Sequence, residues 1–267
     1  MNAYDKDGNV LNSAYSKDGT RLSVAYAADG TPITFDDFLD TAVVTALTPM
    51  SLSGIKQGAC TDGTYIYQIS FTNNQYKTGT LVKYGISDGI YTTKTFDETI
   101  PFNHGNDMAY NPNTGHIYVA AMSSDGAVIE LDTDLNYVGT HYLVGPNGTT
   151  YQVWGLCYDR KTNRFLSEYG TGLAVYDQSF NYLSWFEIPP HPSATGQGME
   201  TDGDYIYRVT YNPNLIDVAT MEGAYVATID NPMSGEPETL MYDWATGKYY
   251  VNKNESSGLF YEVQLKA

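Results

Sequence analysis

A hairpin unit that recurs five times along the chain constrains its fold more than any other feature of the sequence. The clearest copy spans residues 105–121, where two apolar runs, 108–110 and 117–119, flank the turn sequence Asn-Pro-Asn-Thr-Gly. Pro112 presets φ for a turn, and Asn or Gly tolerates the left-handed residue that closes it. Two β-runs joined in this way predict a β-hairpin.

The spacing of the copies predicts the architecture. Corresponding residues in the second run of each copy are separated by 51, 48, 41 and 43 positions. These residues are Tyr67, Tyr118, Leu166, Tyr207 and Tyr250. A hairpin unit that recurs every ~40–50 residues is typical of a β-propeller, in which each repeat forms one four-stranded blade. We therefore expect an all-β chain with a five-bladed β-propeller, and we rank a large β-sandwich with accidental similarity well below it.

The last repeat supplies only three strands before the chain stops, so one blade lacks its outer strand. The β-rich segment 43–47 can provide it and join the two ends of the ring. Such closure suppresses exposed sheet edges.

The first 34 residues follow a different repeat, with a period of 11 residues. Each of its three units carries Ala-Tyr and then a tight-turn Asp-Gly pair. Units this short cannot bury a core alone, so we expect them to pair with other copies in an oligomeric β-stem. The predicted organisation is a stem at 1–34, a linker at 35–42 and the propeller at 43–267. Calcium binding at Asp5, Asp7 and Asn9 is the weaker alternative, because the late Glu of an EF-hand loop is missing.

Charge and composition exclude several classes of partner. The formal net charge of −17 disfavours nucleic acid and anionic membranes, both of which attract Lys and Arg. No apolar run approaches the ~20 residues that span a bilayer, and the N-terminus has no basic flank or apolar stretch of a secretory signal. The two cysteines, Cys60 and Cys157, fall in repeats that are not neighbours, which predicts buried free thiols. We expect no metal and no cofactor.

Residues at the start of each innermost strand converge on one end of a propeller's central channel. The repeat alignment places amides, carboxylates, a histidine and a tryptophan there: Gln57, His104, Asn106, Asp107, Gln152, Trp154, Gln197 and Glu238. Amides and carboxylates hydrogen-bond hydroxyl groups, and an indole face packs on sugar C–H groups. A polar concavity with an aromatic wall predicts a carbohydrate site. In the alternative interpretation, these groups satisfy one another and buried water.

Catalysis is a separate hypothesis. Glycoside hydrolysis needs two carboxylates flanking the bond, and Asp107, Glu200 and Glu238 are the candidates that we would test. No motif fixes their roles, and the chain has no Gly-x-Ser-x-Gly, phosphate-binding loop or His-Glu-x-x-His sequence.

Two stretches resemble proteins of a known kind. The tandem Ala-Tyr-x-x-Asp-Gly units look like attachment segments of phage tail or fibre proteins. The stretch His-Gly-Asn-Asp-Met-Ala-Tyr-Asn-Pro-Asn-Thr-Gly-His-Ile-Tyr-Val is similar to propeller domains of phage-encoded proteins of Gram-positive bacteria. The resemblance implies a virion appendage, assembled in the host cytoplasm, that is a homotrimer. Its stem would contact other virion proteins, and its propeller would bind host-surface glycan, either as a receptor-binding or decoration protein or, alternatively, as a glycoside hydrolase or lyase. A purely structural virion protein is the third possibility.

Overall fold

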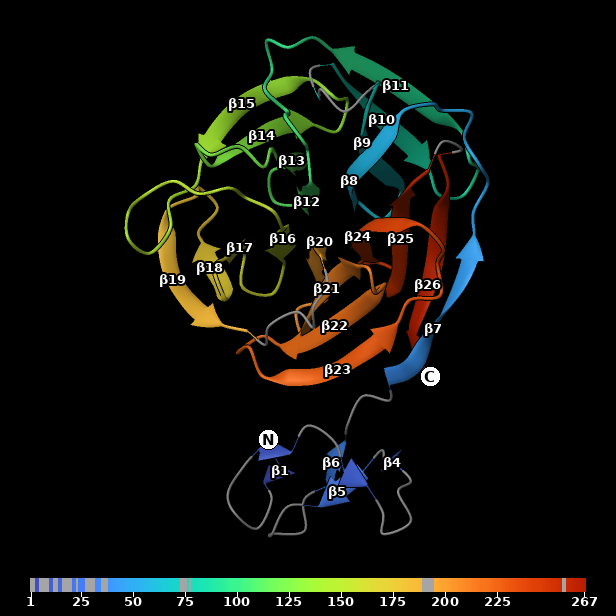
Figure 1. Cartoon of the computed structure of the whole chain (residues 1–267), viewed down its shortest axis with the longest axis vertical. Helices are drawn as coiled ribbons and strands as arrows, with labels where there is room; N and C mark the ends of the chain where they lie inside the picture. Colours follow the sequence, from blue (N-terminus) through green and yellow to red (C-terminus); the bar gives the residue numbers. More distant parts are fainter. Residues whose placement is uncertain are drawn as a thin grey trace.

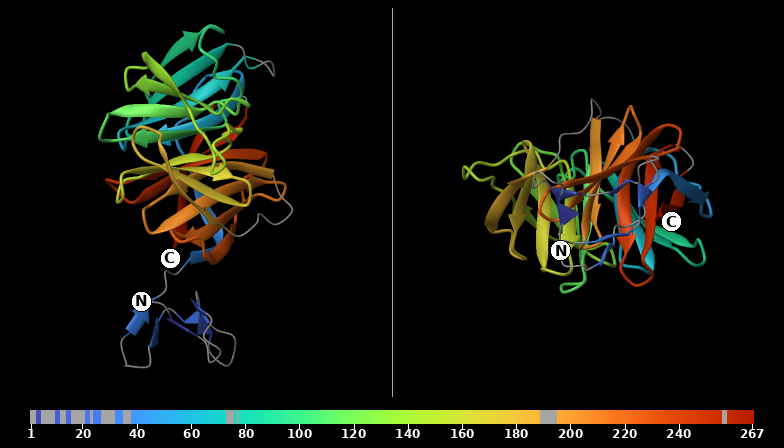
Figure 2. Two further views of the ribbon diagram at one scale, coloured as in Figure 1. Left: turned by 90° about the vertical axis from the view of Figure 1, so that its left-hand side faces the viewer. Right: turned by 90° about the horizontal axis from the view of Figure 1, so that it is seen from below.

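The computed structural model describes residues 38–72, 76, 78–188, 195–255 and 258–267, together with the backbone of six short strands before residue 35. Four-stranded antiparallel units stand around a common axis (Figure 1). In each unit the strands follow one another outward from that axis, and seen from the side the units form a disc (Figure 2). This arrangement is a β-propeller, as the repeat spacing predicts.

Three of the sheets contain four strands each. The first comprises β8 (Ile55–Thr61), β9 (Tyr65–Phe71), β10 (Gly79–Gly85) and β11 (Tyr91–Phe96). The second comprises β12 (Asp107–Asn111), β13 (His116–Ala120), β14 (Ala127–Asp132) and β15 (Tyr137–Tyr142). The third comprises β16 (Leu156–Asp159), β17 (Arg164–Tyr169), β18 (Gly172–Tyr176) and β19 (Tyr182–Glu187).

Eight further strands form one sheet in the order β20-β21-β22-β23-β7-β26-β25-β24. One half comprises β20 (Thr195–Thr201), β21 (Tyr205–Tyr211), β22 (Leu215–Thr220) and β23 (Tyr225–Asp230). The other comprises β24 (Glu236–Asp243), β25 (Lys248–Asn254), β26 (Phe260–Lys266) and β7 (Phe38–Ala46). Among the described residues, the strand pairing between the halves is the parallel bridge of β23 with β7, at Asp230 and Thr41.

Strand β7 closes the ring, which confirms the prediction made for segment 43–47. It pairs antiparallel with the last strand, β26, with Val44 opposite Val263 and Ala46 opposite Tyr261. The strand begins at Phe38, earlier than predicted, so residues 38–42 are strand and not linker. The reason is that Phe38 and Ala42 are buried in the same hydrophobic cluster as Val263 and Leu265, which extends the pairing toward the N-terminus.

The hydrophobic core lies between successive sheets. Neighbouring residues on one strand point to opposite faces, so Ile66 packs toward β24–β26 while Tyr67 and Ile69 pack toward β12–β14. Because both faces of each sheet are covered, the inner strands are almost continuously buried. Both cysteines are free and buried, as expected. No helix among the described residues is long and apolar enough to cross a membrane.

The turns of the recurring hairpins share one kind of contact, made by a carboxylate or amide side chain at the C-terminal end of the inner strand. Its side-chain oxygen accepts the backbone N–H two residues further on, for example Thr64 N to Asp62 Oδ1 at 2.8 Å and Asn113 N to Asn111 Oδ1 at 2.9 Å. Such side chains stabilise a turn by replacing a backbone acceptor. The predicted left-handed residue is present, with φ of 70° at Gly115 and 56° at Asn163.

Before residue 35, the described strands pair in three short hairpins. These are β1 (Ala3–Tyr4) with β2 (Val10–Leu11), β3 (Ala14–Tyr15) with β4 (Arg21–Leu22), and β5 (Val24–Tyr26) with β6 (Pro32–Thr34). The pairing follows the predicted 11-residue period. The residues considered for calcium, Asp5, Asp7 and Asn9, lie outside the described part of the chain.

Candidate functional site

The innermost strands β8, β12, β16, β20 and β24 are neighbours around the axis, and they begin at the same end of it (Figure 1). We call the polar residues at this end the mouth: Gln57, Asn106, Gln197, Glu236 and Glu238. These residues lie at or just before the N-terminal ends of innermost strands, where the connections from the preceding sheets enter the ring.

Asp107 lies directly beneath the mouth and is fully buried. Its Oδ1 accepts hydrogen bonds from Met108 N at 2.9 Å and Thr239 Oγ1 at 3.1 Å. Its Oδ2 accepts the backbone N–H groups of Leu156 and Met199, both at 2.9 Å. Burial raises the pKa of the Asp107 carboxyl, and these four donors oppose that rise. One carboxylate thus joins four inner-strand segments at the axis.

Small residues at the equivalent positions of the other repeats make room for this carboxylate. A Cβ on Gly198 would lie 2.9 Å from Asp107 Oδ1, and a Cβ on Gly58 would lie 2.6 Å from Asp107 Cα. Because all its acceptor capacity is used within the protein, Asp107 has no oxygen left for a substrate. The structure therefore gives this predicted site residue a structural position, below the mouth and not in it.

The amides of the mouth form a second layer of contacts. Asn106 Nδ2 donates to the carbonyl oxygens of Trp154 at 2.7 Å and Gln197 at 2.9 Å. Gln197 Nε2 in turn donates to Glu236 Oε1 at 3.1 Å, and Asn254 Nδ2 donates to Glu236 Oε2 at 3.0 Å. These bonds fix the position of the mouth relative to β16, β20 and β25.

Glu238 and Gln57 are the least satisfied members of the mouth. They are 1% and 3% exposed, and Gln57 Nε2 donates to Glu238 Oε1 at 3.3 Å. Within the described part of the chain, Gln57 Oε1 and Glu238 Oε2 have no hydrogen-bond partner. Buried polar atoms are rarely left unpaired. Burial, with the charges of Glu236 and Asp107, raises the pKa of Glu238 well above its ordinary value.

Aromatic side chains stand beside this polar layer. The side chain of Trp154 is 40% exposed, next to the carbonyl group that Asn106 binds. Tyr76 and His104 stack with ring centroids 4.3 Å apart. Burial, together with the charges of Glu238 and Glu236, raises the pKa of the Tyr76 hydroxyl. Burial lowers the pKa of His104, with Glu236 opposing the shift, so the imidazole is neutral near pH 7.

The structure brings together most of the predicted residues and adds two. Gln57, His104, Asn106, Trp154, Gln197 and Glu238 lie at or beside the mouth. Gln152 is exposed and makes no hydrogen bond with them in the described structure. Glu236 and Tyr76 were missed. Glu236 was detectable, because it precedes Glu238 by two positions on one strand and so shares its face.

Glu200 lies at the opposite end of the channel. Its oxygens accept Thr201 N at 2.7 Å and Tyr242 N at 3.3 Å, next to the hairpin turns. Burial raises its pKa to about 8. Four residues of strand separate Glu238 from Tyr242, which corresponds to roughly 13 Å. Glu200 and Glu238 are therefore too far apart to flank one bond as a carboxylate pair.

Arg160 covers this opposite end. Its guanidinium lies over the rings of Tyr110, at 5.5 Å, and Trp244, at 5.4 Å, and it interacts electrostatically with Glu200. Asp107 thus fills the channel below the mouth, and Arg160 lies at its far end. No group of three or more His, Cys, Asp or Glu residues in the described structure could hold a metal ion.

These features define a β-propeller with a polar mouth at one end of its axis. No family model matches the chain, and no curated protein is similar to it. It is similar to the solved structure of Myxococcus xanthus glutaminyl cyclase, with a TM-score of 0.64 and 14% identity over 85% of this chain and 97% of that one. It is also similar to regucalcin, a calcium-binding protein of Agrobacterium tumefaciens, with a TM-score of 0.55 and 11% identity over 83% of this chain and 94% of that one. At such identities the likeness concerns the fold alone.

Proposed function

We propose that the propeller binds carbohydrate at the mouth. The observation that carries the proposal is a buried polar layer in which Gln57 Oε1 and Glu238 Oε2 have no partner among the described residues, together with the exposed residue Trp154, whose backbone carbonyl Asn106 binds. Sugars present C–H faces that pack on aromatic rings and hydroxyl groups that donate to such acceptors. Few polar groups, fixed in position by the protein, suit a ligand of this kind.

The same proposal includes a ring of five blades. The eight-stranded sheet then counts as two blades, because its halves share a single parallel bridge. Five hydrophobic clusters, one between each pair of successive four-stranded units, support this count.

The proposed setting is a virion appendage that carries the propeller as its head. It rests on the resemblance of the N-terminal repeats to phage attachment segments, and on the three short hairpins found there. Two-stranded hairpins are marginally stable alone, which favours pairing between copies in a trimer and contact with other virion proteins. The ligand would then be a host-surface glycan.

Replacing Trp154 by alanine is expected to weaken glycan retention about tenfold, or about 1.4 kcal/mol, because an aromatic anchor is removed from the site. The measurement is retention of the purified protein on cell-wall polysaccharides of candidate hosts. Tyr142→Ala is the matched control, since Tyr142 is exposed on the outer strand β15. Equal retention by both variants and the unchanged protein would contradict a site at the mouth.

Removal of residues 1–34 is expected to convert an oligomer into a monomer, because the hairpins that would pair between copies are gone. Light scattering after size-exclusion chromatography measures the mass, and thermal unfolding of the remaining propeller serves as the control. A mass per particle that corresponds to the same number of copies before and after removal would disprove the role of the stem.

An enzyme acting on the same glycans is the second candidate function. One observation favours it: Glu238 is buried with a raised pKa and an unpaired oxygen, as in a general acid. The retention experiment decides between the two when new reducing ends are followed in the same tubes. Release that Glu238→Gln abolishes would assign catalysis, and retention without release would favour binding.

A further inference from the structure

The two unpaired atoms of the mouth are side-chain oxygens. Gln57 Oε1 is an acceptor, and Glu238 Oε2 is one when Glu238 is ionised, which a nearby positive charge favours. Gln57 Oε1 and Glu238 Oε2 belong to side chains that are joined by one hydrogen bond, so they lie in the same place. The bond uses the only donor group of the pair, Gln57 Nε2, which fixes the amide orientation. A ligand that completes this pair must therefore bring hydrogen-bond donors.

The electrostatic surroundings of the pair are acidic. The charges that act on Glu238 are those of Glu236 and Asp107. The oxygens of Glu236 and Asp107 are engaged by amides, backbone N–H groups and a hydroxyl, none of which carries a charge. A positive group on the ligand would relieve the repulsion among these carboxylates and strengthen its own hydrogen bonds.

The aromatic wall suits a positive group as well. Tyr76 stacks on His104 with ring centroids 4.3 Å apart, and its hydroxyl interacts electrostatically with Glu238 and Glu236. A cation over a tyrosine face is attracted by the ring quadrupole. Tyr76 adopts a left-handed backbone conformation, with φ of 50°. Such a conformation is unfavourable for a residue with a side chain and is found preferentially at functional sites.

We propose that the mouth recognises the ammonium group of an amino sugar, bound between the Glu238–Gln57 pair and the Tyr76 ring. This inference rests on the proposed carbohydrate function and narrows its ligand class. The ammonium brings three donors and a positive charge, whereas an N-acetylated sugar brings one amide N–H and no charge. An acidic sugar is rejected, because its carboxylate would face Glu236 and Glu238.

The experiment compares two oligosaccharides of the same length and linkage, a fully deacetylated chitotetraose and its fully N-acetylated counterpart. Titration calorimetry at pH 6 and at two salt concentrations gives both affinities. The expected result is binding of the amine form at least about tenfold more tightly than the acetylated form. Glu238→Gln should remove most of that preference, because the amide keeps the shape but not the charge.

Control variants separate this site from the general acidity of the chain. Glu262→Gln removes an exposed carboxylate that pairs with Lys248 on the outer part of the propeller, and it should leave the preference intact. A preference lost equally in both variants would assign it to net charge and overturn the inference. A thermal unfolding curve for each variant ensures that folded proteins are compared.

The remaining outcomes are also decisive. Equal or tighter binding of the acetylated form would overturn the inference and keep the carbohydrate function. Binding of neither oligosaccharide, with no retention on any host polysaccharide, would overturn both. If triglycine amide binds and neither oligosaccharide does, the site recognises the ammonium group of a peptide, and the inference is wrong.

Discussion

Replacing Asp107 by asparagine is expected to lower the free energy of unfolding by about 3–5 kcal/mol, because a buried charge that satisfies several donors is lost. Asp107 accepts four hydrogen bonds, two on each carboxylate oxygen. An asparagine side chain offers one oxygen only. Its NH₂ group would face either Leu156 N and Met199 N, which are both donors only, or Met108 N and Thr239 Oγ1, of which only the hydroxyl can accept. At least one backbone N–H therefore loses its acceptor in either orientation.

Urea unfolding followed by tryptophan fluorescence measures this effect. Asp134→Asn is the matched control, because Asp134 is a highly exposed aspartate whose nearest cation is Lys83 at 3.6 Å, and surface changes of this kind stay within about 0.5 kcal/mol. If Asp107→Asn were as stable as the control and yet lost ligand binding or turnover, the residue would be a functional group and not the structural centre of the ring.

The fold could be predicted from the sequence because the local sequence of each repeat is enough to predict its hairpin. The turn residues and the apolar runs on both sides of them are enough to locate the hairpins, and the period is enough to arrange them around an axis. Ring closure by β7 was predictable for a similar reason, since the last repeat lacks a strand and segment 43–47 has strand composition. The start of β7 at Phe38 was not, because it depends on packing against Val263 and Leu265.

The sequence predicted which end of the channel carries the polar residues, but not which of them have unpaired atoms. Alignment of the repeats puts Asp107 and Glu238 one position apart in register, and nothing in the sequence says which of them lies at the axis. The outcome depends on how the inner strands pack: Gly198 leaves space for the Asp107 carboxylate, and Gly58 lets its strand approach the Asp107 backbone. Tyr76 lies in the connection between β9 and β10, outside the repeated hairpin, so no alignment of the repeats could relate it to Glu238.

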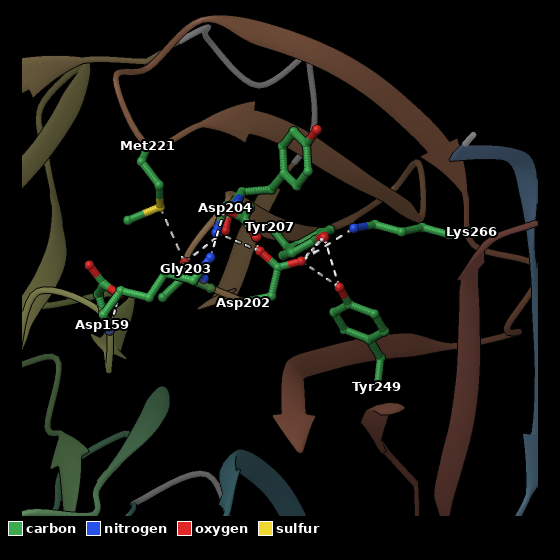
Figure 3. Close-up of polar contacts among 11 residues, drawn as sticks. Asp159, Asp202, Gly203, Asp204, Tyr207, Met221, Tyr249 and Lys266 are labelled. Carbon is green, nitrogen blue, oxygen red and sulfur yellow. Dashed lines mark hydrogen bonds and ion pairs between the residues drawn. The ribbon is translucent and has the colours of Figure 1, made fainter. Parts of the chain in front are cut away.

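The second large effect is expected at Asp202, which ends strand β20 (Figure 3). Its Oδ1 accepts Asp204 N and Tyr205 N, as in the equivalent turn of the first sheet. Its Oδ2 accepts the hydroxyl groups of Tyr207 at 2.7 Å and Tyr249 at 2.8 Å, and Lys266 Nζ lies 3.4 Å away. Asp202 therefore ties β21, β25 and β26 together across the junction of the two halves of the eight-stranded sheet.

Replacing Asp202 by alanine is expected to lower the free energy of unfolding by about 3–4 kcal/mol, since it leaves two buried phenol groups without their charged acceptor. Asp62 is an internal control. It makes the same turn contacts, but it binds a single phenol, that of Tyr67. Because Asp62 is also less buried, Asp62→Ala should cost only about 1–2 kcal/mol. Equal losses in the two variants would contradict a role for the Tyr249 and Lys266 contacts.

The pH dependence of the Asp202 effect gives an independent check. Burial alone would raise the pKa of Asp202, but hydrogen bonds from Tyr207, Tyr249 and two backbone N–H groups outweigh it and lower the pKa below its ordinary value. A carboxyl group with a lowered folded-state pKa stabilises the protein above its unfolded pKa, and the contribution disappears as the pH falls through the folded-state value. The difference between the unchanged protein and Asp202→Ala should therefore be constant from about pH 5 to 7 and shrink below about pH 4, where the unfolded carboxyl binds its proton. Urea unfolding at several pH values measures it, and a difference that does not shrink in acid would mean that packing, not the charge of Asp202, holds the two halves of the sheet.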